Sequence, residues 1–259
     1  MSPQPSGTVF SGTAEAYASY RPAYPAVLLS HLRNAAGTSG AGVLVDLACG
    51  PGRIAIPMAA HFRRVIAIDV EPEMIAVGKQ RASRAEVANI EWHVLPAEQL
   101  TLAPNSVELV TIGEAFHRLD QPRMLDLADE WLLPKGFVAT LGGESIWSGR
   151  EPWKSIVVSV SNRWTRTTLA EPTTAQWGEP FEIFRTAGWQ VTTYQMCVEM
   201  NWTTDSIIGF MRSTSFASAH ALGAKASQFE ADLRQELLAF APEDRFPAEQ
   251  RFGYTLARR

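Results

Sequence analysis

Residues 43–52 read Val-Leu-Val-Asp-Leu-Ala-Cys-Gly-Pro-Gly, and this stretch decides the fold of the chain. Its β-branched and apolar beginning predicts a short buried strand, and its small residues predict a tight turn. The apolar content of residues 54–60 then fits a helix that packs back on a sheet. A strand, a turn and a helix in this order present free backbone N–H groups to a ligand, and Gly50 and Gly52 allow that ligand to approach the backbone closely.

Two classes of cofactor are bound by such a turn, and the position of the acid separates them. Residues 50–55 satisfy G-x-G-x-x-A, so an NAD-dependent oxidoreductase is one interpretation. In that fingerprint the strand normally stays apolar up to the first glycine, whereas Asp46 stands four residues before Gly50. The pattern D-x-A-x-G-x-G closely resembles that of class I methyltransferases, which depend on S-adenosylmethionine (SAM). Ala48 replaces their usual first glycine. The resemblance implies that Asp46, Ala48, Gly50 and Gly52 bind the cofactor.

A second predicted strand, residues 64–69, also ends in an acid. Asp69 follows the turn at the distance that one crossover helix and a parallel strand require. An acid at that strand end accepts hydrogen bonds from both ribose hydroxyls, so Asp69 is predicted as the ribose ligand, with Val70 beside it. Pro72 marks the first turn of the next helix. Met74 lies close enough to this helix start to contact the adenine, although it also suits an ordinary core position.

The next strand ends extend the resemblance. Residues 96–100 (PAEQL) resemble the family's (D/P)AE-x-L stretch, which implies that Ala97 and Glu98 bind the adenine edge, with an exposed loop acid as the alternative for Glu98. Residues 106–120 resemble the family's FDLV…A-x-HW-x-D stretch, with Arg118 where tryptophan is frequent, and they place Gly113 at the cofactor. Residues 133–136 match its LKPGG turn with a single glycine. The sequence therefore resembles the UbiE-like, type 11 group of small-molecule methyltransferases.

A tyrosine-rich segment precedes this core. In the type 11 group such a segment folds over the cofactor, which implies that Arg21 pairs with the SAM carboxylate through a charge-assisted bond. The alternative for Arg21 is a solvated residue on a surface turn. Tyr17 and Tyr24 are candidates for the substrate site, or for simple helix packing.

The resemblance implies an α/β fold with a Rossmann-like, mostly parallel sheet, an antiparallel last strand, an N-terminal helical cap and helical insertions on the substrate side. We expect one methyltransferase domain over the whole chain. Its parts are a cap at 13–36, a SAM-binding core at 41–142, a lid or insertion at 143–177, and a C-terminal part at 178–259 with a helical insertion at 203–240.

Aromatic residues suggest where a substrate binds. Trp147 and Trp153 belong to a tryptophan-rich segment that we interpret as a lid or pocket wall, because aromatic faces hold planar or apolar molecules well. Some of its tryptophans are expected to attach the insertion to the core instead. Phe116 is a further candidate for substrate contact. His117, just past the fourth strand, is the candidate general base because its unperturbed pKa lies near neutrality. An orienting role is an equal alternative for His117, and Glu114 is a weaker candidate base.

The predicted reaction is an in-line displacement that transfers the SAM methyl group to O or N of a small aromatic or heterocyclic metabolite and leaves S-adenosylhomocysteine. The cofactor carries the reactivity, so the protein chiefly aligns the two reactants. An NAD-dependent oxidoreductase and a non-catalytic protein of the same fold are the alternatives.

Composition narrows the remaining possibilities. The 259 residues are 46% hydrophobic and 19% charged, as in an ordinary globular enzyme. A net charge of −4 without a basic block gives no reason to expect nucleic acid as a partner. Cys49 and Cys197 make neither a disulfide framework nor a metal cluster, so no metal is expected. No apolar run reaches the length of about 18 residues that a membrane span needs, and we expect a cytoplasmic protein.

Overall fold

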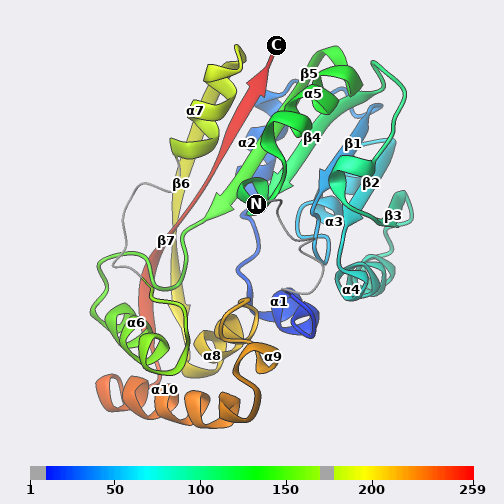
Figure 1. The fold of residues 1–259 in the computed structure, drawn as a ribbon. Helices are drawn as coiled ribbons and strands as arrows, with labels where there is room; N and C mark the ends of the chain where they lie inside the picture. Colours follow the sequence, from blue (N-terminus) through cyan, green and yellow to red (C-terminus); the bar gives the residue numbers. More distant parts are fainter. Residues whose placement is uncertain (1–9, 170–177) are drawn as a thin grey trace.

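A computed structural model describes residues 10–169 and 178–259, and its centre is a seven-stranded sheet (Figure 1). The strands lie in the order β3-β2-β1-β4-β5-β7-β6. Their bounds are β1 Val43–Leu47, β2 Arg64–Asp69, β3 Ile90–Val94, β4 Val107–Gly113, β5 Leu132–Gly143, β6 Gln190–Trp202 and β7 Phe246–Arg258. The predicted Rossmann-like α/β class is confirmed.

Strand β1 forms the middle of the parallel part, and every residue of it is buried. It pairs in parallel with β2 and with β4, and this register places Asp46 between Ala67 and Thr111. Burial on both faces explains the nearly continuous apolar run in its sequence. Leu44 belongs to the hydrophobic cluster on one face of the sheet, whereas Val45 belongs to the cluster on the other.

The last strand differs in direction, as predicted. Strand β7 lies between β5 and β6 and is antiparallel to both. Strand β7 is 13 residues long, and β6 and β7 together extend from the sheet into a helical layer (Figure 1). The end of β7 nearest that layer contains Pro247 and alternates buried with exposed residues, so an apolar run marked only its sheet portion.

Helices cover both faces of the sheet. Residues of α2, α3 and α4 pack on one face, and residues of α5 and α7 pack on the other. The bounds of these helices are α2 Ala26–Ala35, α3 Ala55–Met58, α4 Pro72–Arg84, α5 Gln121–Trp131 and α7 Gly178–Thr186.

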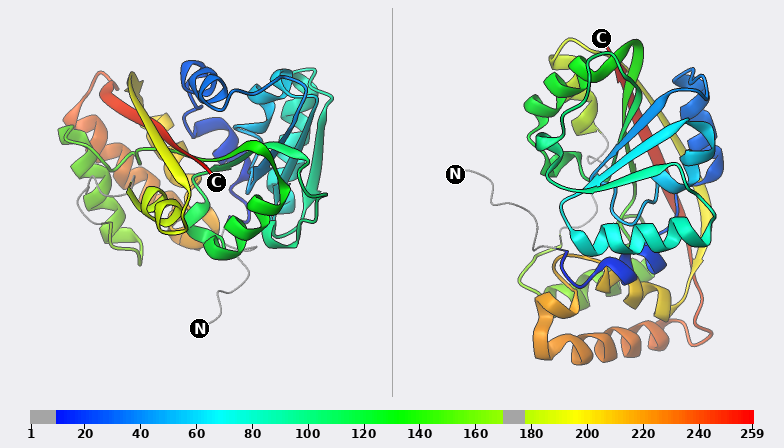
Figure 2. Two further views of the ribbon diagram at one scale, coloured as in Figure 1. Left: turned by 90° about the horizontal axis from the view of Figure 1, so that it is seen from above. Right: turned by 90° about the vertical axis from the view of Figure 1, so that its right-hand side faces the viewer.

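A third layer of helices lies beyond the carboxyl ends of the parallel strands (Figures 1 and 2). It contains α1 Ala14–Tyr20, α6 Pro152–Trp164, α8 Thr204–Arg212, α9 Ala219–Leu222 and α10 Ala226–Phe240. Helices α8, α9 and α10 fall between β6 and β7, at the predicted insertion. Helix α6 lies in the segment expected as a lid or insertion at 143–177, and Val157 and Val160 are fully buried on its inner face. Short 3-10 helices at Ala59–His61, Ala97–Gln99, Phe116–Arg118 and Gly223–Lys225 complete the fold.

Candidate active site

Two adjoining cavities lie between the carboxyl ends of the strands and the helical layer. The smaller has a volume of about 300 Å³ and the larger about 530 Å³. They share a wall made by Phe10, Tyr17, Glu114, Ala115 and Arg118. Two molecules bound in these cavities would therefore meet at one boundary.

The smaller cavity gathers most of the residues predicted to bind a cofactor. They come from the ends of β1, β2 and β4, from the start of α4 and from the loop after β3. These residues are Ala48, Gly50, Asp69, Val70, Met74, Ala97, Glu98 and Gly113. Arg21 lines the larger cavity instead, and Gly52 lines neither.

The turn after β1 has an unusual backbone. Ala48, Gly50 and Gly52 have φ angles of 50°, 53° and 78°, in the left-handed region. This conformation is unfavourable for Ala48, by an amount on the order of 1–3 kcal/mol. A Cβ atom at Gly52 would lie 2.7 Å from the Trp92 ring, so this glycine is required by packing behind the turn.

Asp46 supports this turn from beneath. Its carboxylate accepts hydrogen bonds from the Ala55 N–H at 3.0 Å and from the Thr111 hydroxyl at 2.8 Å. The side chain borders a separate cavity of about 20 Å³ and does not line the 300 Å³ cavity. Burial raises the pKa of this carboxyl to about 7. Asp46 thus supports the turn by hydrogen bonds, and its direct contact with the cofactor stays a prediction.

Asp69 and Glu71 form the acidic wall at the end of β2. Asp69 accepts hydrogen bonds from the Gly50 N–H at 2.7 Å and the Glu71 N–H at 2.9 Å, and burial raises its pKa. Glu71 is 4% exposed and lines the same cavity. Its Oε1 atom has no hydrogen-bond partner within the described part of the chain. Sequence reasoning missed Glu71 because it directly precedes Pro72 at a helix start.

The opposite wall comes from the loop after β3. Glu98 accepts a hydrogen bond from the Asp120 N–H at 3.1 Å, which joins this loop to the start of α5.

Met74 of α4 is 4% exposed and packs with Ala14 and Val77 while also lining the cavity. Both interpretations of Met74, core residue and cavity wall, therefore apply.

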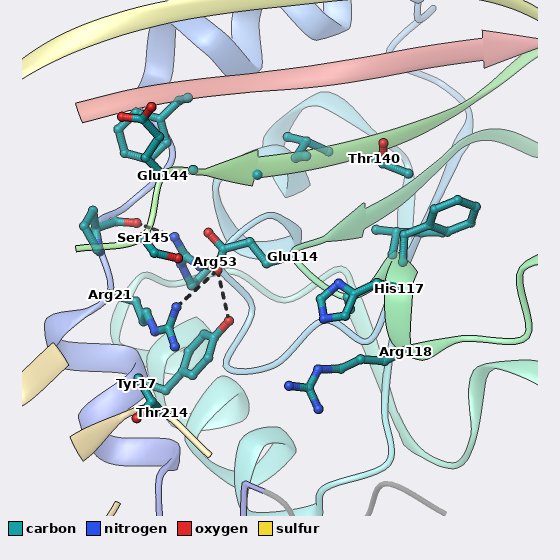
Figure 3. A pocket seen from close by; sticks show the side chains of 18 of the residues that line it. Tyr17, Arg21, Arg53, Glu114, His117, Arg118, Thr140, Glu144, Ser145 and Thr214 are labelled. Carbon is teal, nitrogen blue, oxygen red and sulfur yellow. Dashed lines mark hydrogen bonds and ion pairs between the residues drawn. The ribbon is translucent and has the colours of Figure 1, made fainter. Parts of the chain in front are cut away.

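An ion-pair network surrounds Glu114 at the wall between the cavities (Figure 3). Its Oε2 lies 3.1 Å from Arg53 Nη1, 3.7 Å from Arg21 Nη1 and 3.4 Å from the Tyr17 hydroxyl. Although burial raises the pKa of Glu114, the two arginines outweigh this effect and the net pKa is lowered. The φ angle of Glu114 is 55°, an uncommon value for a residue other than glycine.

Arg53 is the main residue that sequence reasoning missed. Its side chain is 8% exposed, donates to the Pro22 carbonyl and stacks over Tyr24 at 4.7 Å from the ring centroid. Tyr24 is 5% exposed and borders only the small cavity beside Asp46. The expected substrate contact of Tyr24 is therefore corrected, because this ring packs beneath Arg53. Tyr17, by contrast, lines both large cavities.

The aromatic residues divide between wall and core. Trp147 lines the larger cavity beside Phe216, with ring centroids 5.5 Å apart. Trp153 is 2% exposed, and its indole donates to the Pro247 carbonyl, so its predicted substrate contact is wrong: it attaches α6 to β7. Phe116 touches the larger cavity but is mostly buried in a stack with Phe184. Trp177 lies outside the described residues.

His117 and Arg118 complete the site (Figure 3). Both are exposed and lie on the short 3-10 helix after β4, and both line the larger cavity. The turn at residues 213–216 reaches the same cavity through Thr214, Ser215 and Phe216. Ser213 accepts a hydrogen bond from Arg21 Nε at 2.8 Å, which ties this turn to the N-terminal cap.

Parts of this chain are similar in sequence to known proteins. Residues 44–136 match the methyltransferase domain family. The chain is 47% identical over 70 residues to the ubiquinone/menaquinone biosynthesis C-methyltransferase UbiE of Rubrivivax gelatinosus. This match covers 27% of this chain and 26% of that protein. It is 32% identical over 103 residues to the ubiquinone biosynthesis O-methyltransferase of Acinetobacter baumannii, covering 39% of this chain and 43% of that protein. The matches thus span less than half the length of these relatives.

The fold also occurs among solved structures. The SAM-dependent methyltransferase from Thiobacillus denitrificans, in complex with S-adenosyl-L-homocysteine, matches with a TM-score of 0.57 and 17% identity. The match covers 97% of this chain and 98% of that one. At this identity the likeness concerns the fold.

Proposed function

We propose that this chain, whose residues 44–136 match the methyltransferase domain family, transfers a methyl group from SAM to O or N of a small aromatic or heterocyclic molecule. The observation that carries the proposal is the charge of the smaller cavity. Its charged lining residues are Asp69, Glu71, Glu98, Glu114 and Asp120, against Arg118 as the one guanidinium among the described lining residues. An acidic lining suits a sulfonium cation and disfavours the pyrophosphate of a dinucleotide.

The polar atoms of this cavity fit a nucleoside. Asp69 and Glu71 offer carboxylate acceptors for ribose hydroxyls, and the unpartnered Oε1 of Glu71 gains a donor when such a hydroxyl is present. Val70 and Met74 give an apolar surface for the adenine ring, and Glu98 stands at its edge. In this proposal Arg21 and Arg53 pair with the cofactor carboxylate, and Glu114 faces its ammonium group.

The larger cavity suits the methyl acceptor. Its volume of about 530 Å³ lies in the range typical of small-molecule sites, about 300–1,000 Å³, and Trp147, Phe210 and Phe216 supply aromatic surfaces. The parts of the chain that we assign to the substrate side are the cap at 13–36 and the insertions at 143–177 and 203–240. The core at 41–142 carries the cofactor site.

Bound SAM supplies an electrophilic methyl group on its sulfonium. The protein contributes alignment across the shared wall, and orientation of two reactants accounts for about 7–11 kcal/mol of barrier in favourable cases. Where the acceptor is an O–H or N–H group, we assign His117 the role of receiving that proton, because it lines the acceptor cavity.

Isothermal titration calorimetry with S-adenosylhomocysteine and NAD tests the cofactor. We expect binding of the first and none of the second, and Asp69→Asn should weaken that binding at least tenfold, because it removes a charged acceptor. Binding of NAD alone would favour the oxidoreductase. Binding of S-adenosylhomocysteine without SAM turnover on any acceptor of a broad panel would favour a non-catalytic protein.

A further inference from the structure

Arg118 lies at the boundary of the two cavities and differs from the other arginines there. Its side chain extends into the larger cavity toward Tyr17 (Figure 3) and lies over the Phe10 ring, 4.8 Å from the centroid. Within residues 10–169 and 178–259 it forms no ion pair, whereas Arg21 and Arg53 both pair with Glu114. Partial burial and the nearby Arg21 charge lower the pKa of Arg118, although Tyr17 acts in the opposite direction.

The charged residues lining the larger cavity are mainly basic, because Arg21, Arg53 and Arg118 stand against Glu114 and Glu144. Glu114 is occupied by two arginines, and Glu144 lies 3.9 Å from Arg251. Neither carboxylate of the larger cavity therefore pairs with Arg118, which also borders the acidic smaller cavity without forming an ion pair among the described residues. A sulfonium at the shared wall would add further positive charge to this region, so an acceptor with a negative group would be attracted to the cavity.

Aromatic surfaces stand in the same cavity as Arg118. Trp147 and Phe216 meet edge to face at 5.5 Å, and Phe210 lies behind Trp147 at 6.1 Å. These rings line the cavity together with the Arg118 guanidinium, and the Arg21 guanidinium lies over the Phe210 ring, 4.3 Å from its centroid. A planar ring that carries a carboxylate matches this arrangement, because arginine binds a carboxylate in a bidentate fork.

We infer that the methyl acceptor is an aromatic carboxylate and that Arg118 binds its carboxylate group within the larger cavity. This inference rests on the proposed methyl transfer and narrows its substrate class. Arg118 is then a specificity-determining residue, which selects an anionic acceptor over its neutral analogue.

Calorimetric titration of the protein saturated with S-adenosylhomocysteine tests the inference, with benzoate and benzamide as a matched pair of probes. The saturated cofactor site leaves only the acceptor cavity for either probe. We expect benzoate to bind at least tenfold more tightly than benzamide. Arg118→Gln should abolish this preference while leaving benzamide binding unchanged, and Arg118→Lys should retain part of it. Arg123→Gln, an exposed arginine outside both cavities, is the control and should retain all of it.

Two results overturn the inference. One is equal or undetectable binding of the two probes by the unaltered protein, and the other is an undiminished benzoate preference in Arg118→Gln. Failure of the proposed function has a different signature, since the unaltered protein would then not bind S-adenosylhomocysteine at all. In that case the same benzoate and benzamide titrations, made without it, still report on Arg118.

Discussion

Replacement of Asp46 by asparagine isolates the cost of burying a carboxyl group beneath the cofactor turn. Asparagine has nearly the same volume and keeps an oxygen that accepts from the Ala55 N–H. Burial raises the pKa of Asp46 from its ordinary 3.8 to about 7, although hydrogen bonds from Thr111 and Ala55 act in the opposite direction. The folded protein therefore holds this proton to a much higher pH than the unfolded chain does.

The sign of the effect follows from this difference. Between pH 4 and pH 7 the folded state binds more protons at Asp46 than the unfolded state, so its contribution to the free energy of unfolding falls as pH rises. With these two pKa values, titration of Asp46 lowers the free energy of unfolding of the wild-type protein by about 2.5 kcal/mol between pH 5 and pH 8. Asp46→Asn lacks this titrating group and so does not show this loss. The variant should thus gain stability relative to the wild type by about that amount over this range.

Urea unfolding of both proteins at pH 5 and pH 8 measures this change. Titrating groups that do not interact with Asp46 cancel in the comparison, and Asp126→Asn on the exposed face of α5 provides a control that should show no such gain. A stability difference between Asp46→Asn and the wild type that is the same at both pH values would refute the reasoning, because the carboxyl would then titrate alike in the folded and unfolded chains.

Three further changes test other parts of the site. Arg53→Met should lower the free energy of unfolding by about 3 kcal/mol in urea denaturation, because Glu114 then keeps only the longer ion pair with Arg21. Adding Glu114→Gln to this variant should recover part of the loss. A double variant that is no more stable than Arg53→Met contradicts this reasoning. Gly209→Ala should lower the free energy of unfolding by about 1–3 kcal/mol in the same assay, because the new Cβ atom would lie 2.2 Å from the Tyr20 ring. Adding Tyr20→Ala should relieve this clash. An unchanged stability of Gly209→Ala argues against the tight contact of α1 with α8. His117→Gln should reduce kcat about 100-fold or more on an O–H or N–H acceptor while calorimetry gives an unchanged affinity for S-adenosylhomocysteine; unchanged turnover dismisses the base.

The sequence determined the parts of the fold that depend on neighbours along the chain. The turn at residues 48–52 was readable because it needs small residues in left-handed conformations, and Asp69 was readable because a parallel strand must return after one helix. Helix α10 buries Phe229, Leu233 and Leu237, which recur at helical spacing in the sequence. Local dihedral preferences and periodicity carry this information.

The tertiary structure decided which side chains meet. Trp147 and Trp153 look alike in the sequence, yet Trp153 on α6 is buried against β7, whereas Trp147, which precedes α6, lies on a cavity wall. Arg53 and Glu114 pair across 61 positions of the chain, in a cluster that no local pattern announces. Such pairs depend on how whole helices and strands pack, because a shift of a few ångströms between elements exchanges one partner for another while the local sequence pattern stays the same.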